Sequence, residues 1–83
     1  MKTQAEIMTY AEMESAFDGE WVLIGEPELT SMNEVIRGVV LGHDEDRVAV
    51  YEVLWRLREE GRAPSEIAVH YFGAFPNDVE FLI

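Results

Sequence analysis

The densest group of polar side chains lies at residues 43–46, where a histidine precedes three acidic residues. An imidazole and carboxylates can together bind a divalent cation, which makes His43, Asp44 and Asp46 candidate metal ligands. Hard cations need oxygen ligands that converge from several backbone directions, and no glycine-turned calcium loop follows this group. Acidic residues at the start of a helix are also explained by capping and by the helix dipole. We therefore predict a helix start here and no metal.

Two further features could carry chemistry. His70 could act as a general base, but no serine, cysteine or second histidine stands at a spacing that defines a catalytic group. Gly38 and Gly42 are four residues apart in one apolar run, so we expect them on one face of a strand, where a neighbour can pack closely. The sequence has no glycine-rich nucleotide loop. We predict no catalytic residue and no cofactor, and hence no enzyme.

The charge of the chain limits its partners. Seventeen acidic residues against six basic ones give a formal net charge of −11, which repels phosphate backbones and anionic lipids. The same charge accelerates association with a basic protein. There is no cysteine, no run of about 20 apolar residues and no signal-like start, so a cytoplasmic protein that binds neither nucleic acid nor membrane is expected.

The first half of the chain predicts one helix and two strands. Thr9 and Glu12 form a capping box, which starts a helix over residues 9–17 and leaves residues 1–8 as an arm before a single domain at 9–83. The apolar run at residues 20–25 predicts a strand, residues 27–33 a loop, and residues 34–43 a second strand that returns antiparallel beside the first.

The second half predicts a longer helix and two more strands. The acidic residues before position 47 and Gly61 bound a helix over residues 46–60. Residues 66–72 and 79–83 have strand patterns. A strand, a helix and a strand in succession favour a right-handed crossover between parallel strands. The expected fold is α/β (α+β), with a small mixed sheet and the order α-β-β-α-β-β.

Four segments resemble a family of short uncharacterised bacterial proteins, frequent in cyanobacteria, whose first strand contains a tryptophan. They are FDGEWVLI at residues 17–24, RGVVLGH at 37–43, IAVHYFG at 67–73 and PNDV at 76–79. Members are often encoded beside a small retropepsin-like protein. The resemblance implies an antitoxin-like partner of a neighbouring gene product, and it brings no catalytic residue.

The predicted helix at residues 46–60 is apolar over more of its circumference than one sheet can cover. One stripe consists of Val50, Val53, Leu54 and Leu57, and a flank of Val48, Tyr51 and Trp55 lies beside it. The flank packs either against the first helix, through Tyr10, Met13 and Phe17, or against another chain. We leave both alternatives open.

The two predicted helices are also too few to cover all the apolar surface of the sheet. The strands at residues 20–25 and 66–72 are apolar on both faces, and only two helices are predicted. If both helices lie on one face, the other face exposes side chains such as Trp21 and Tyr71, and so large a patch marks an interface. The sequence thus favours a non-enzymatic protein-interaction module with a protein partner or a homo-oligomeric state. The alternative is a small-ligand or metal-binding domain that uses His43, Asp44, Asp46 and also His70.

Overall fold

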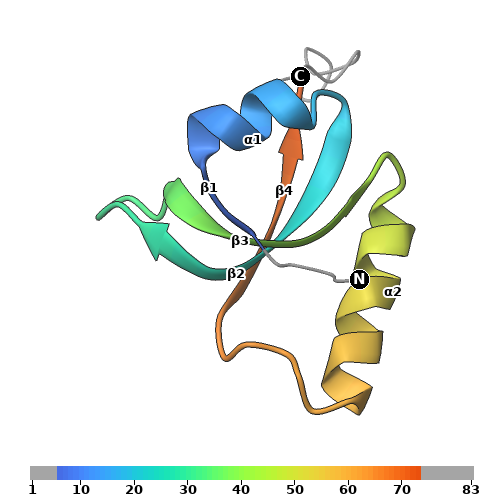
Figure 1. Ribbon diagram of the computed structural model, residues 1–83. Coiled ribbons are helices and arrows are strands. Elements are labelled where there is room, and N and C mark those ends of the chain that lie inside the picture. Colours follow the sequence, from blue (N-terminus) through green and yellow to red (C-terminus); the bar gives the residue numbers. More distant parts are fainter. Residues whose placement is uncertain (1–5, 74–83) are drawn as a thin grey trace, which may run out of the picture.

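The computed structural model describes residues 6–73, whose elements follow the order β-α-β-β-α-β (Figure 1). The elements are β1 (Glu6–Thr9), α1 (Tyr10–Ala16), β2 (Glu20–Leu29), β3 (Val35–Asp44), α2 (Arg47–Glu59) and β4 (Ile67–Phe72). The four strands form one sheet in the order β1-β3-β2-β4. The fold is therefore a small α+β arrangement of one sheet and two helices, as expected at this coarse level. The strand predicted at residues 79–83 lies outside the described residues.

The sheet is antiparallel at every pairing between the described strands, so the expected mixed sheet is wrong. β3 and β4 do run in the same direction, because both pair antiparallel with β2, but β2 lies between them. The physical reason is the composition of β2. Val22, Leu23 and Ile24 are fully buried, and a strand with apolar side chains on both faces is best placed at the centre of a sheet.

The predicted order is also wrong at its start, because a strand precedes the first helix. Residues 6–9, most of which belong to the expected arm, pair antiparallel with β3 from Glu6 opposite Val40 to Thr9 opposite Arg37. Four residues carry too little alternation to signal a strand. The capping box is confirmed: the Glu12 backbone N–H donates to Thr9 Oγ1 (3.2 Å), and the Thr9 N–H donates to Glu12 Oε1 (2.9 Å).

The two helices cover opposite faces of the sheet (Figure 1). On the α1 side, the core consists of Met13, Val22, Ile24 and Phe72. On the α2 side, it consists of Leu23, Val50 and Leu54. Neighbouring residues of β2 thus serve different cores. The possibility that α1 packs on Tyr51 and Trp55 is therefore wrong, and so is the condition that both helices share one face.

A bulge in β3 changes which side chains reach each helix. Leu23 pairs with Gly42 but Ile24 pairs with Val40, so Leu41 is the extra residue. Gly38 consequently faces Ile24 on the α1 side, whereas Gly42 faces Val53 on the α2 side. Their expected common face is wrong, because simple alternation cannot anticipate an extra residue.

The β2–β3 hairpin is longer than the predicted strand and loop. β2 continues to Leu29 although it contains Pro27, since the register shifts between Gly25 and Glu28 accommodate the missing N–H. The turn is held by Thr30, whose Oγ1 accepts the N–H groups of Met32 and Glu34, both at 3.1 Å. The hairpin tip lies at the end of the molecule away from α2 (Figure 1).

Candidate functional site

The structure separates the candidate metal ligands from one another. The bulge turns His43 toward α1, where its ring stacks on Phe17 (4.3 Å between centroids) and its Nδ1 lies 2.6 Å from Glu20 Oε1. Asp44 Oδ1 accepts the Asp46 N–H (2.8 Å), and Asp46 Oδ1 accepts the Val48 N–H (2.9 Å). Across residues 6–73, no three His, Cys, Asp or Glu side chains are placed to hold a metal ion. The predicted helix start is confirmed, with Asp46 as the N-cap.

Replacing Asp46 by alanine should lower the free energy of unfolding by about 0.5–2 kcal/mol, because the Val48 N–H loses its acceptor. Urea denaturation followed by circular dichroism measures the change. Asp18→Ala, an exposed aspartate outside both helices, is the control. EDTA should leave the melting curve of the wild-type protein unchanged, and a chelator-sensitive transition would contradict the assignment of Asp46 as a cap alone.

His70 lies in a hollow that the sequence did not reveal. The hollow has a volume of about 460 Å³ and is lined by Tyr10, Asn33, Glu34, Val35 and His70, from α1, the hairpin and β4. The Tyr10 hydroxyl is 3.3 Å from His70 Nε2, and the two rings meet edge to face with centroids 5.4 Å apart. These two residues are sixty positions apart, so only the fold brings them together.

Burial sets the charge of His70. Desolvation of the half-buried imidazole lowers the pKa of His70 below its ordinary value of 6.5, so the ring is neutral at pH 7. A neutral imidazole and a phenol can each donate or accept one hydrogen bond. The hollow holds no serine or cysteine beside this pair. The arrangement is therefore suited to holding a small polar group.

The lowered pKa of His70 predicts a pH dependence of stability. The unfolded chain, in which the histidine has its ordinary pKa, binds a proton more readily than the folded chain. The free energy of unfolding should therefore fall as the pH drops from about 7.5 through 6.5 toward 5.5. His70→Gln should flatten this slope, because the group whose pKa differs between the folded and unfolded chain is removed. Denaturant titrations at each pH test this, and an unchanged slope in His70→Gln would contradict it.

The predicted interaction residues fall into two groups. Val48 and Trp55 lie on the outer side of α2, with 60% and 52% of their surface exposed. The Arg58 guanidinium carbon lies 5.4 Å from the Trp55 ring centroid. Tyr51 and Trp21 instead pack against the core on the α2 side of the sheet. The Trp21 ring contacts Tyr71, with 5.2 Å between centroids. Among the predicted interaction residues, only Val48 and Trp55 thus have apolar side chains that are more than half exposed.

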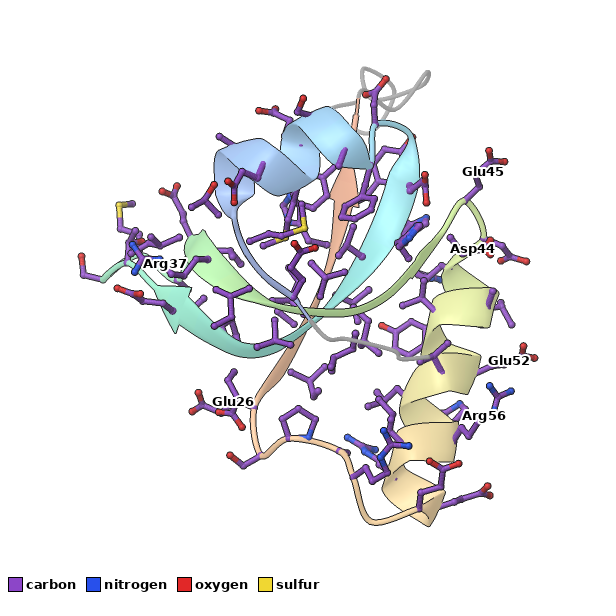
Figure 2. The ribbon with its side chains drawn as sticks, in the orientation of Figure 1. Glu26, Arg37, Asp44, Glu45, Glu52 and Arg56 are labelled. Atoms are coloured by element: carbon purple, nitrogen blue, oxygen red, sulfur yellow. The ribbon has the colours of Figure 1, made fainter. Side chains whose placement is uncertain are left out.

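Charge is distributed unevenly along the chain. Residues 6–43 contain eight acidic residues and one arginine, and four of the five arginines lie between residues 47 and 62. Residues 6–43 are consequently strongly acidic, whereas α2 carries both signs. Figure 2 shows Glu52 and Arg56 on the side of α2 that faces away from the sheet.

No protein-family model, curated protein or solved structure matches this chain. Among residues 6–73, neither α1 nor α2 has the length and apolar character that crossing a membrane requires. The function is therefore inferred from the geometry of the chain itself.

Proposed function

We propose that this protein is a non-enzymatic protein-interaction module that binds with the outer face of α2, defined here as Val48, Glu52 and Trp55. The observation that carries the proposal is the exposure of Trp55 on a helix whose opposite face is buried. Tryptophan is enriched among the residues that contribute most to binding between proteins. A large aromatic ring at the surface of a regular helix is a rigid anchor for a partner.

Other surfaces support binding less well. The open sheet face that the sequence suggested is absent from residues 6–73, because each face carries a helix. The remaining large apolar side chains with high exposure are Ile7, Leu29 and Met32, which lie on β1 and the hairpin. They belong to the sheet edge and the hairpin tip. Val48 and Trp55, by contrast, are two turns apart on the same face of one helix.

Trp55→Ala should weaken association by at least about tenfold while lowering the free energy of unfolding by less than about 1 kcal/mol. The ring is half exposed, so its removal opens no cavity. Sedimentation and urea denaturation of the full chain measure the two effects. Met32→Ala, at 77% exposure on the hairpin, is the control and should change neither. A loss of several kcal/mol in stability, or unchanged association, would count against the outer face of α2.

The acidic residues on and after α1 support an antitoxin-like role toward a basic protein. Glu12, Glu14 and Asp18 lie on or directly after α1 without a nearby arginine in sequence, so this side attracts positive charge. Binding of a basic partner here should weaken steeply between about 0.05 and 0.5 M salt, because the attraction is screened. Co-purification with the products of neighbouring genes at both salt concentrations tests this. Retention that does not respond to salt would contradict it.

A second candidate function is the binding of a small ligand in the Tyr10–His70 hollow. Glu34 lines this hollow and has its side chain at the surface, so an amine or guanidinium group fits its charge. Titration with ethylammonium and methylguanidinium should shift the NMR resonances of the His70 ring. Glu34→Gln should abolish the shift, and Glu14→Gln on α1 should leave it intact. Unmoved resonances at millimolar probe would exclude this function for these two cations.

A further inference from the structure

We infer that a second hollow, here called the His43 hollow, binds a protonated amine that carries an apolar chain. The hollow has a volume of about 430 Å³, within the range of about 300–1,000 Å³ that is typical of small-molecule sites. Its lining includes Glu6, Met8, Phe17, Val40 and His43, and none of these residues lines the Tyr10–His70 hollow. The inference therefore concerns a separate site and does not depend on the outer face of α2.

The bulge in β3 brings His43 to this hollow. Without the extra residue Leu41, Val40 and His43 would lie on opposite faces of the sheet, because they are three positions apart. With it, His43 pairs with Val22 and lies on the α1 side, as Val40 does. Bulges are frequent next to functional sites, where they redirect a side chain.

Two contacts fix the orientation of the His43 ring. The ring stacks on Phe17 with an interplanar angle of 29°, and its Nδ1 lies 2.6 Å from Glu20 Oε1. Because a carboxylate accepts a hydrogen bond, the proton of the neutral ring is assigned to Nδ1, and Nε2 is then an acceptor. No hydrogen bond occupies this Nε2 within residues 6–73. A ligand that donates an N–H group can therefore bind to it.

The charges around the hollow favour a cation. Glu6 lines the hollow and Glu20 adjoins His43, whereas no lysine or arginine belongs to the lining that residues 6–73 provide. An anionic ligand would be repelled by both carboxylates and by the net charge of −11. An ammonium group has three donors and no acceptor, which matches the Glu6 carboxylate and His43 Nε2.

The remaining walls favour an apolar chain on the amine. Met8, Phe17 and Val40 are partly buried and pack against the α1-side core, so they form an apolar wall beside the two acceptors. An alkyl chain that contacts this wall is removed from water. Each methylene group added to the amine should therefore tighten binding by about twofold to fourfold.

NMR titration of the full chain with butylammonium tests the site. The chain contains two histidines, so the ring resonances of His43 and His70 report on the two hollows separately. At about pH 8, where histidine side chains are ordinarily neutral, the His43 ring resonances should shift with a dissociation constant of roughly 1–10 mM. The alcohol n-butanol, which has the same chain but no charge, should bind at least about tenfold more weakly.

Variants of the two acceptors test the assigned contacts. Glu6→Gln should weaken butylammonium binding at least about threefold, whereas Glu34→Gln, the same change in the other hollow, should leave the His43 shift unchanged. His43→Phe keeps a ring beside Phe17 but removes Nε2, and it should also weaken binding at least about threefold. The methyl resonances of Val40 report on binding in that variant. Circular dichroism confirms that every variant is folded.

Two sources can supply such an amine, a free alkylamine or a lysine side chain of a basic protein. Titration with N-acetyllysine amide distinguishes them: binding within about threefold of butylammonium supports a lysine side chain, and its loss supports a free amine. His43 resonances that stay unmoved at about 50 mM butylammonium would overturn the inference. Equal binding of butylammonium and n-butanol, or unweakened binding in Glu6→Gln, would overturn it as well.

Discussion

Phe72→Ala is expected to lower the free energy of unfolding by about 3–5 kcal/mol, enough to unfold much of a domain this small at room temperature. The Phe72 ring is 1% exposed and packs in the α1-side core with Met13, Val22 and Ile24. Its centroid lies 5.0 Å from the Tyr10 ring. Removing the ring leaves a cavity under α1 that neighbouring β2 cannot fill, because β2 is fixed by strands on both sides.

Urea denaturation followed by tryptophan fluorescence and circular dichroism measures this loss. Trp55→Ala is the matched control, since it also removes an aromatic ring but from a half-exposed site. Phe72→Leu should cost less than half as much as Phe72→Ala, because it retains most of the buried volume. A loss below about 1.5 kcal/mol in Phe72→Ala would mean that the α1-side core is not closed around this ring.

Gly38→Ala is expected to cost about 2–3 kcal/mol. A Cβ atom at position 38 would overlap Ile24 Cγ2, and it would lie 3.3 Å from the Gly25 carbonyl oxygen and from the Pro27 Cα. Ile24 is fully buried and branched at Cβ, so its methyl group has little freedom to move aside. The strain must therefore spread into the backbone of β2.

Gly42→Ala is the control for this prediction, because it adds the same methyl group four residues along the same strand. There the new Cβ would lie 3.4 Å from Val53 Cγ1, an ordinary contact distance. Its effect on the free energy of unfolding should stay within about 0.5 kcal/mol. Equal losses in the two variants, measured by urea denaturation, would contradict the assignment of Gly38 and Gly42 to opposite faces.

Local signals in the sequence predicted α1, β3, α2 and β4 to within one residue at each end, because the groups that make these elements are close in sequence. The Thr9 and Glu12 capping box and the Asp46 cap lie where hydroxyl and carboxylate side chains precede an apolar pattern. The boundaries of α2 and β4 differ from the predicted ones by one residue. Strand pairing could not be predicted in this way, since it depends on which strand buries the most apolar surface. In the structure β2 lies between β3 and β4. The predicted crossover instead pairs β3 directly with β4.

The candidate sites were predicted in part. Adjacent residues suggested a site at 43–46, yet the bulge at Leu41 turns His43 toward Glu20 and away from the aspartates. Helical spacing left open whether the Trp55 flank packs on the first helix or on another chain, and the placement of α1 on the other face of the sheet excludes the first of these. The Tyr10–His70 hollow had no sequence signal, because its residues come from three separate segments.

The position of β2 between β3 and β4 has a consequence for how the chain folds. β2 and β3 are joined by a short turn and can pair early, whereas β4 pairs with β2 from Glu20 opposite Phe72 and must arrive from far along the chain. Such non-local pairing is slow compared with hairpin closure, so the docking of β4 should limit the folding rate. Until β4 docks, β2, the most apolar strand of the protein, lies at an edge of the sheet. Nascent chains at high concentration should therefore pair with one another through β2 before β4 of the same chain covers it.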